Sequence, residues 1–223
     1  MADAMSLRDA GPIVLEMAAA IQREQGFLGE IDGAIGDGDH GINMAKGFRL
    51  AAAKLADEGG FTLQHGFLVL GDTLLGDIGG SMGPLYGTFF TEMAESLGEA
   101  ERLDGARFQA MLHAGVAAVV DLGGAKPGDK SLVDVLAPAE HAFAEAQSAG
   151  AGFAESLVLM RDASAAGLES TRDMVARIGR ASRLGERSRG TLDAGAASCN
   201  MLLATLADGL LAWLGTASGG TAP

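Results

Sequence analysis

The sequence predicts an all-α protein of a single domain, and three observations support this prediction. Apolar residues recur at intervals of three and four along most of the chain, which is the spacing of one face of an α-helix. No convincing run of alternating β-branched residues bounded by turns is present, so no strands are predicted. Glycine is unusually frequent for a helical protein, with 34 residues, and four clusters of it mark the positions where we expect special loops.

Eight apolar stripes mark the expected helices in chain order. Each stripe places its residues on one helix face, as in helices that bury one side in a shared core. About eight helices in one bundle or barrel is the resulting expectation. The stripes are Ile13, Met17 and Ile21; Ala45, Phe48, Ala52 and Leu55; Leu63, Phe67, Leu70 and Leu74; Leu85, Phe89 and Met93; Phe108, Leu112, Val116 and Val119; Leu132, Leu136, Ala139 and Phe143; Phe153, Leu157, Met160 and Ser164; and Cys199, Leu202, Leu206, Leu210 and Trp213.

Composition narrows the class of protein. The 223 residues, 48% of them hydrophobic, suffice for one buried core. A net charge of −13 argues against general nucleic-acid binding and against adsorption to anionic membranes. The single cysteine, Cys199, excludes an internal disulfide and lies on an apolar stripe, which indicates a buried thiol. The N-terminus does not resemble a signal peptide, and no apolar stretch approaches the roughly 20 residues that span a bilayer, so we expect a cytoplasmic protein without a membrane partner.

Four glycine-rich loops each precede an expected helix. A loop that leads into a helix N-terminus offers free backbone N–H groups and the positive end of the helix dipole, which together favour an anion. Four such loops can converge at one end of a bundle, although ordinary punctuation between helices explains any single loop equally well. The loops are Gly33–Gly41, Gly76–Gly87, Gly123–Gly128 and Gly179–Gly195.

The first loop contains the densest group of polar side chains. Asp32, Asp37 and Asp39 alternate with glycines that allow the backbone to fold the carboxylates inward. Such close carboxylates repel one another unless a hard cation compensates them, and magnesium is favoured because few carboxylates are present and phosphates can complete its shell. The alternative is a capping turn at the start of the next helix. His40 and Asn43 follow, and each can face a phosphate or serve that helix.

The second and third loops also suit phosphate. Ser81 supplies a hydroxyl among Gly79, Gly80 and Gly83, but no Walker lysine is present, so a P-loop fold is not indicated. In the third loop, two lysines are available either as charges for a ligand or as solvated surface residues. They are Lys126 and Lys130.

The fourth loop is the one basic segment in an acidic protein. Arginines suit phosphate clamping and charge stabilisation in phosphoryl transfer, and they equally suit docking of an acidic partner. The segment is followed by the turn Asp193–Gly195 ahead of the last expected helix. Its arginines are Arg177, Arg180, Arg183, Arg187 and Arg189.

Together these motifs resemble the L subunit, or L domain, of dihydroxyacetone kinases. The resemblance covers about Asp9 to Trp213 and rests on four ordered motifs. We therefore expect an L-type domain over 9–216, an N-terminal tail over 1–8 and a flexible tail over 217–223. The motifs are I-G-D-G-D-H-G-I-N-M, G-G-S-M-G-P-L-Y-G-T-F-F, K-P-G-D-K-S-L-V-D-V and G-R-A-S-R-L-G-E-R-S-R-G-x-x-D-A-G-A.

The resemblance implies a fold and a set of site residues. It implies an eight-helix antiparallel barrel with a nucleotide, ADP or ATP, at one end. Asp32, Asp37 and Asp39 match the family's metal ligands, which hold two magnesium ions. Arg180 matches a catalytic residue that stabilises the transferring group. The positions that match nucleotide contacts are His40, Gly41, Ile42, Asn43, Ser81, Met82, Gly123, Leu132, Arg180, Asp193, Ala194 and Gly195.

The resemblance also implies a function shared between subunits. A phosphoryl group would pass from the nucleotide to a small hydroxyketone or polyol on a separate K-type sugar-binding subunit, and the L chain alone would be inactive. Either a phosphotransferase-system M subunit recharges a bound ADP, or ATP exchanges freely. A nucleotide-sensing module that binds a transcription regulator, a fatty-acid-kinase-like domain and a metal-dependent phosphatase are the alternatives. The acceptor and the oligomeric state, including a homodimer, stay open.

Overall fold

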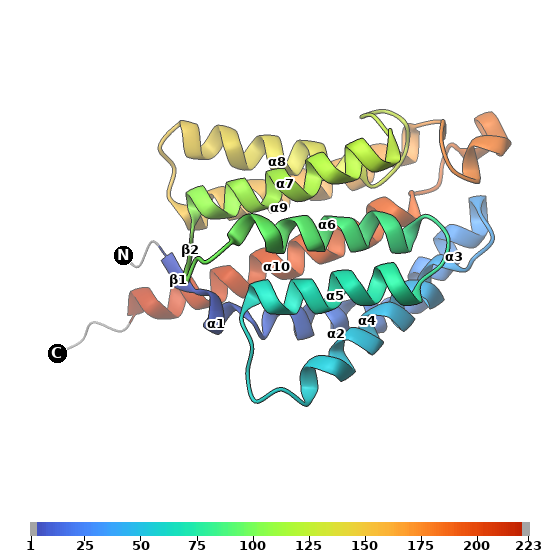
Figure 1. Cartoon of the computed structure of the whole chain (residues 1–223). Coiled ribbons are helices and arrows are strands. Elements are labelled where there is room, and N and C mark those ends of the chain that lie inside the picture. Colours follow the sequence, from blue (N-terminus) through green and yellow to red (C-terminus); the bar gives the residue numbers. More distant parts are fainter. Residues whose placement is uncertain (1–3, 220–223) are drawn as a thin grey trace.

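Ten α-helices and two 3-10 helices dominate the computed structural model, which describes residues 4–219 and side chains as far as Gly215 (Figure 1). The predicted all-α class is confirmed. The elements are β1 (Ala4–Ser6), α1 (Leu7–Ala10), α2 (Ile13–Arg23), α3 (Gln25–Ile35), α4 (His40–Ala56), α5 (Leu63–Asp77), α6 (Met82–Leu97), β2 (Arg102–Asp104), α7 (Gly105–Gly123), α8 (Val133–Ser148), α9 (Phe153–Ser170), η1 (Thr171–Asp173), η2 (Ala181–Ser188) and α10 (Ala194–Gly219).

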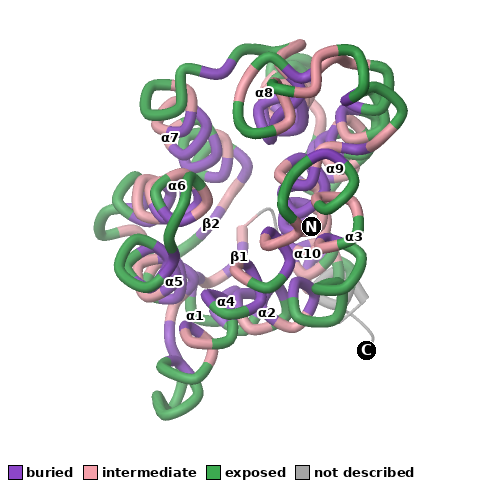
Figure 2. Tube along the Cα trace, turned by 90° about the vertical axis from the view of Figure 1, so that its right-hand side faces the viewer, coloured by how far each residue is buried: buried purple, intermediate pink, exposed green. Residues whose placement is uncertain are grey.

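Eight of the α-helices close into a ring, which Figure 2 shows nearly end-on. Helix α2 contacts α4, each helix from α4 to α9 contacts the next, and α10 contacts α2. Neighbouring helices of the ring run antiparallel, so the N-termini of α4, α6, α8 and α10 lie at one end, which we call the mouth. Helices α5, α7 and α9 begin at the opposite, far end. The expected eight helices correspond to this ring, and α1 and α3 are additional to it.

A short β-ribbon at the far end was not predicted. Strands β1 and β2 pair antiparallel, with Met5 opposite Leu103, and both side chains are buried. The expectation of no strands was wrong because three-residue strands are too short to show an alternating pattern. Residues 4–8, which we expected to belong to a tail, therefore pack against the domain. Of the expected C-terminal tail, residues 217–219 continue α10 and residues 220–223 lie outside the described residues.

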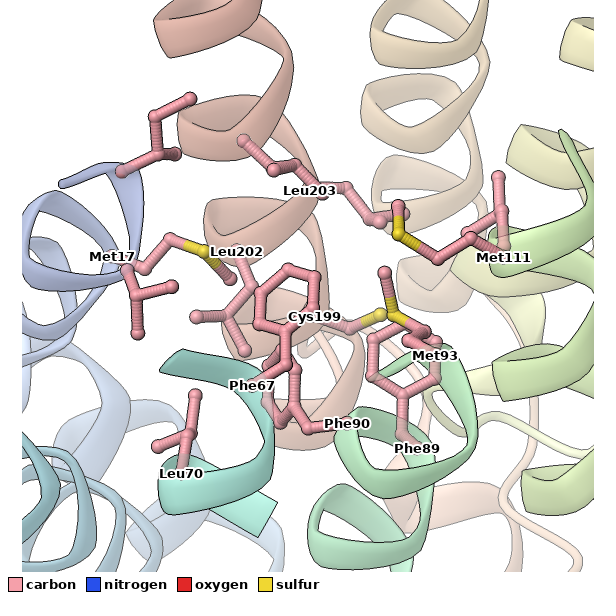
Figure 3. Packing of buried hydrophobic residues seen from close by; sticks show 14 of the residues in the cluster. Met17, Phe67, Leu70, Phe89, Phe90, Met93, Met111, Cys199, Leu202 and Leu203 are labelled. Carbon is pink, nitrogen blue, oxygen red and sulfur yellow. The ribbon is translucent and has the colours of Figure 1, made fainter. Parts of the chain in front are cut away.

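The interior of the ring is filled with apolar side chains (Figure 3). Phe67 and Phe90 pack with ring centroids 5.3 Å apart, and Met93 and Met111 fill the space beside them. The nearly complete burial of the expected stripes explains why apolar spacing alone revealed the helices. Cys199 is buried among them, as predicted, and burial raises the pKa of its thiol well above the usual range.

Helix α10 corrects one expectation about apolar length. Its Ala194–Gly215 portion is long and apolar enough to cross a membrane by length and composition, whereas we expected no stretch of that kind. Half of the most apolar window is buried inside the domain, and α10 contacts α2, α8 and α9 in the ring. Its apolar character therefore follows from its place in the wall of the ring, where it serves the common core.

Candidate functional site

The four glycine-rich loops converge at the mouth. They enclose a pocket of about 410 Å³ whose lining includes residues from the loops before α4, α6, α8 and α10. The predicted convergence is confirmed, because the antiparallel ring brings every second helix N-terminus to the same end. The residues directly before α4, α6 and α8 place no side chain on their helix's N–H groups. Farther back, Oδ2 of Asp32 accepts the first N–H of α4 and Oγ of Ser131 the first N–H of α8. This arrangement concentrates backbone donors and positive helix ends around one pocket.

Three carboxylates form a cluster at one side of the pocket. Asp32 lies in the last turn of α3, and Asp37 and Asp39 lie in the turn that follows. One oxygen from each side chain lies within 4.8 Å of the others. Gly36 allows this packing, since a Cβ atom there would lie 2.4 Å from Oδ1 of Asp32. The cluster is an all-oxygen donor set of the kind that magnesium or calcium prefers.

Arg180 provides a positive charge beside this cluster. Its guanidinium forms an ion pair with Asp37, and its Nη1 lies 3.8 Å from Oδ2 of Asp39. Arg180 comes from the connection between α9 and α10, almost 150 positions later in the sequence. The fold thus places an arginine directly against the predicted metal ligands, where it also faces any phosphate bound in the pocket.

A buried hydrogen-bond chain holds His40 at the start of α4. Its Nε2 lies 2.8 Å from Oγ of Ser198, whose Oγ lies 2.7 Å from the hydroxyl of Tyr86. Tyr86 also donates to the carbonyl oxygen of Gly195 at 2.9 Å. Burial lowers the pKa of His40 to about 4, although the nearby Asp32 opposes the shift. His40 is therefore a neutral imidazole at neutral pH, with one nitrogen engaged by Ser198.

Asp193 caps α10 at the opposite side of the pocket. Its Oδ1 accepts a hydrogen bond from the backbone N–H of Ala196 at 2.7 Å, and its own N–H donates to Oγ1 of Thr171. Burial raises the pKa of Asp193 to about 6, and the hydrogen bond from Ala196 only partly offsets this effect. The pKa of Asp193 therefore lies close to neutral pH, and a cation or hydrogen-bond donor in the pocket would favour the ionised carboxylate.

The second and third loops complete the walls. Gly80 has a φ of 72°, and Gly83 packs so tightly that a Cβ atom would lie 2.0 Å from the carbonyl oxygen of Ile78. In the third loop, both carboxylate oxygens of Asp134 accept backbone N–H groups, those of Gly128 and Ser131. These contacts fix the backbone on either side of the pocket.

Comparison with known proteins then identifies the family. A family model described as the DAK2 domain matches residues 34–208, which is more than half of the chain. The chain belongs to the DAK2 domain family. The resemblance inferred from the motifs is confirmed.

Several relatives of this DAK2 domain are kinases or kinase subunits. It is 35% identical over 204 residues to the ADP-binding subunit DhaL of PEP-dependent dihydroxyacetone kinase 2 from Listeria innocua, covering 90% of this chain and 93% of that subunit. It is 37% identical over 188 residues to the corresponding Escherichia coli subunit, covering 82% and 88%. A D-erythrulose kinase of Mycolicibacterium smegmatis is 34% identical over 198 residues, which are 86% of this chain but 33% of that kinase.

A solved structure supports the same fold. The dihydroxyacetone kinase of C. freundii in complex with AMP-PNP and Mg2+ superposes with a TM-score of 0.69 at 28% identity. The match covers 89% of the DAK2 chain described here and 33% of the C. freundii chain. The fold of this DAK2 domain therefore occurs in a larger kinase that was solved with a nucleotide analogue and magnesium.

Most of the expected site residues line the pocket of this DAK2 domain, and three do not. Gly41 packs against α3, where a Cβ atom would lie 2.1 Å from the carbonyl oxygen of Gln25. Ile42 is 60% exposed, and Gly123 ends α7 outside the lining. A direct nucleotide contact by these three stays a prediction. The expected residues in the lining are Asp32, Asp37, Asp39, His40, Asn43, Ser81, Met82, Leu132, Arg180, Asp193, Ala194 and Gly195.

Sequence reasoning missed two polar residues beside the pocket and left the role of a third open. Tyr86 and Ser198 lie on apolar helices, and nothing in their spacing reveals that they meet His40. Lys130 was considered as a ligand charge or a surface residue; it is buried and belongs to the pocket lining. Lys126 is exposed outside the pocket lining, and of the five arginines in the basic segment only Arg180 is part of that lining.

Proposed function

We propose that this protein is the nucleotide-binding subunit of a dihydroxyacetone-type kinase. It would hold ADP or ATP with two magnesium ions at the mouth and transfer a phosphoryl group to a small hydroxyketone or polyol. The observation that carries the proposal is the convergence of three carboxylates, an arginine and four loops on one pocket. The match to DhaL subunits over most of their length supports the same role.

The carboxylate cluster fits magnesium. Asp32, Asp37 and Asp39 offer only oxygen ligands, and bound magnesium would neutralise charge on the phosphates of the nucleotide. The backbone N–H groups at the starts of α4, α6 and α8 would orient those phosphates. Arg180 would stabilise negative charge on the transferring group, so the chain's contribution is mainly positioning and electrostatics.

The acceptor and its carrier are assigned by analogy with the relatives. We infer that a K-type subunit presents the hydroxyketone, because relatives of this length are described as subunits and the longer kinases are about three times their size. Purified L chain alone should then leave dihydroxyacetone unphosphorylated, and activity should appear when a K-type subunit is added. Phosphorylation by the L chain alone would contradict this division of labour.

Two phosphoryl donors are compatible with the site. Relatives described as PEP-dependent or PTS-dependent favour a retained ADP that a phosphotransferase-system M subunit recharges. Exchangeable ATP is the alternative donor, and the erythrulose kinases among the relatives favour a different ketose as acceptor. The rate of nucleotide release separates these models, since retention through gel filtration fits a recharged cofactor and rapid exchange fits a substrate.

The site itself is tested by the nucleotide and magnesium content of the purified chain and of Asp37→Asn. We expect bound or readily bound ADP with about two magnesium ions in the original chain. The variant should bind both at least about 100-fold more weakly, because loss of even an outer partner of a metal costs about 10- to 100-fold in affinity. Equal binding by both proteins, or binding by neither, would contradict the proposed site.

A further inference from the structure

The connection between α9 and α10 carries Arg180 to the pocket, and we call residues 171–193 the strap. It is the longest connection between ring helices in the described chain and contains η1 and η2 but no α-helix. Besides Arg180, it supplies Ile178, Gly179 and Asp193 to the pocket lining. A segment without α-helical hydrogen bonds needs other contacts to hold a fixed shape.

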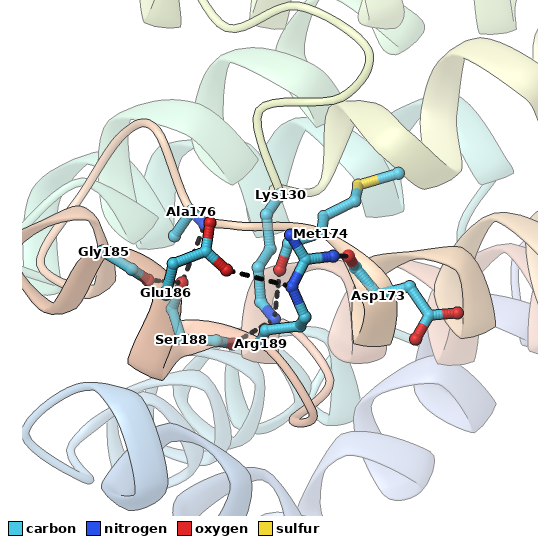
Figure 4. A network of polar contacts seen from close by, with 8 residues as sticks. All are labelled: Lys130, Asp173, Met174, Ala176, Gly185, Glu186, Ser188 and Arg189. Carbon is cyan, nitrogen blue, oxygen red and sulfur yellow. Dashed lines mark hydrogen bonds and ion pairs between the residues drawn. The ribbon is translucent and has the colours of Figure 1, made fainter.

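Lys130, from the loop before α8, supplies the central contacts. Its side chain runs downward into the strap in the view of Figure 4, and only 2% of the residue is exposed. Its Nζ donates to the carbonyl oxygens of Ser188, Thr191 and Met174, at 2.5, 2.6 and 3.3 Å. All three hydrogens of the ammonium group therefore have acceptors within the strap. Burial lowers the pKa of Lys130, and the nearby Asp193 opposes that shift.

The backbone of Lys130 is held in an uncommon conformation to allow this contact. Its φ of 63° makes it the one non-glycine residue with positive φ in the described chain. Asp134 fixes the loop around it by accepting the N–H groups of Gly128 and Ser131. A bulky residue persists in this conformation only when its surroundings enforce it, and such positions concentrate at functional sites.

The strap closes on itself around the ammonium group. The Oγ of Ser188 accepts the backbone N–H of Ala176 and donates to the carbonyl oxygen of Gly185 (Figure 4). Arg189 pairs with Glu186 and donates to the carbonyl oxygen of Asp173. The ends of the strap near Met174 and Thr191 are thus joined through one lysine, and Arg180 lies on the segment between them.

We propose that Lys130 is a positioning residue, which acts by locking the strap so that Arg180 stays against Asp37 and Asp39 and bound nucleotide is retained. Lys130 itself makes no contact with the carboxylate cluster. It joins the third loop to the strap and so fixes two walls of the pocket relative to each other. The effect on nucleotide rests on the proposed function, whereas the effect on the strap does not.

The first experiment measures hydrogen exchange of the nucleotide-free full chain and of Lys130→Met. We expect amides of residues 174–191 to exchange at least about tenfold faster in the variant, because hydrogen bonds to a charged group are lost, while α5 and α6 keep their protection. Lys126→Met, an exposed change in the same loop, should match the original chain. Unchanged exchange in the strap, or uniformly faster exchange everywhere, would overturn the proposal.

A second variant guards against simple misfolding. Lys130→Gly also removes the ammonium group, but glycine adopts positive φ without strain, so the loop keeps its conformation. Both variants should loosen the strap alike if the ammonium group is responsible. A loosened strap in Lys130→Met with a normal strap in Lys130→Gly would overturn the proposal.

The second experiment links the strap to the nucleotide. With N-methylanthraniloyl-ADP and magnesium as the probe, Lys130→Met should release the nucleotide about tenfold or more faster. If Lys130 acts through Arg180, adding Lys130→Met to Arg180→Met should produce little further change, whereas independent effects would multiply. Multiplying effects would overturn the positioning role. Absence of probe binding by the original chain would instead refute the proposed function, and strap exchange would still decide whether Lys130 anchors the strap.

Discussion

The two ends of the helical ring start their helices differently. At the far end, the side chains of Thr62 and Asp104 each accept a hydrogen bond from an N–H group in the first turn of α5 and α7. At the mouth, Asp39, Ser81 and Leu132 precede α4, α6 and α8 in a helical backbone conformation and form no such bond. At the far end, α5 and α7 are thus capped by a side chain, whereas α2 and α9 are not; at the mouth, α10 is capped by Asp193. The starts of α4, α6 and α8, which the preceding residue does not cap, lie around the pocket.

This difference shows how one fold separates stability from binding. Aspartate and serine are among the best N-capping residues, yet Asp39 and Ser81 do not cap α4 and α6. The carboxylate of Asp39 instead belongs to the acidic cluster, and Ser81 lines the pocket. A side chain that caps its own helix has that acceptor oxygen occupied, and Asp39 and Ser81 keep theirs available for the pocket. Asp193 differs from them, because it lines the pocket and also caps α10.

The largest expected effect comes from adding a methyl group to a glycine that packs tightly against backbone, once at each end of the ring. Gly41→Ala at the mouth would place a Cβ atom 2.1 Å from the carbonyl oxygen of Gln25, and Gly11→Ala at the far end would place one 2.0 Å from that of Phe61. Each should lower the free energy of unfolding by about 3 kcal/mol or more, because backbone cannot move aside cheaply. Only Gly41→Ala should also impair ADP binding. Denaturant unfolding and calorimetric titration measure the two effects.

Gly76→Ala serves as the matched control for these substitutions. Gly76 lies in α5 with no atom within 4 Å of an added Cβ, and alanine should stabilise the helix by roughly 0.5–1 kcal/mol. Destabilisation by the control would show that contact distances at these glycines do not predict the outcome.

A smaller effect, specific to the mouth, concerns pH. His40 has a folded-state pKa of about 4 against 6.5, so its contribution to stability falls as pH drops from 6.5 toward 4. Asp193 has a folded-state pKa of about 6 against 3.8, so its ionisation lowers stability as pH rises from 3.8 toward 6. Each contribution is at most about 3 kcal/mol, and the two oppose each other.

Single substitutions should separate the opposing pH dependences of stability that His40 and Asp193 produce. In metal-free, nucleotide-free protein, His40→Gln should leave stability that falls with rising pH over this range, and Asp193→Asn should leave stability that rises. Unfolding free energies measured between pH 4 and 7 test this prediction. Parallel pH profiles for the original chain and both variants would contradict the burial effects assigned to these two groups.

The smallest expected effects compare the caps directly. Asp104→Ala at the far end should lower stability by about 1 kcal/mol, the usual effect of losing an N-cap, and leave ADP binding unchanged. Ser81→Ala at the mouth should change stability by less than about 0.5 kcal/mol but weaken ADP binding in the presence of magnesium. Thermal unfolding and titration with ADP measure both effects in both variants. Equal losses of stability would contradict the difference in capping between the two ends.

Much of the ring was predictable because helix formation and the burial of one helix face leave patterns in neighbouring residues of the sequence. Apolar stripes such as Leu63, Phe67, Leu70 and Leu74 reflect the burial of one helix face, and the glycine clusters indicate loops between helices. The β-ribbon was missed because three residues per strand carry no readable period. Motif order also indicated the family and the acidic cluster, whose members are neighbours in the sequence.

Contacts between segments that are far apart in the sequence could not be predicted from local sequence patterns. The pair of His40 and Ser198 spans 158 positions, and although the first motif indicated His40, nothing along the chain indicated Ser198 as its partner. Lys130 was ambiguous because its role depends on carbonyl groups of the strap, which any sequence would supply. Side chains that bind backbone atoms leave no complementary residue in the sequence to reveal the pairing.

Both described ends of the chain lie at the far end, since β1 contacts α10 and Figure 1 shows the two termini on the side away from the loops. Attachment at Ala4 or after Gly219 would therefore keep the pocket unobstructed. A region similar to this chain forms about one third of two longer erythrulose kinases. Because both ends lie away from the loops, either terminus offers a place for a surface tether or a fluorescent fusion that leaves the pocket accessible.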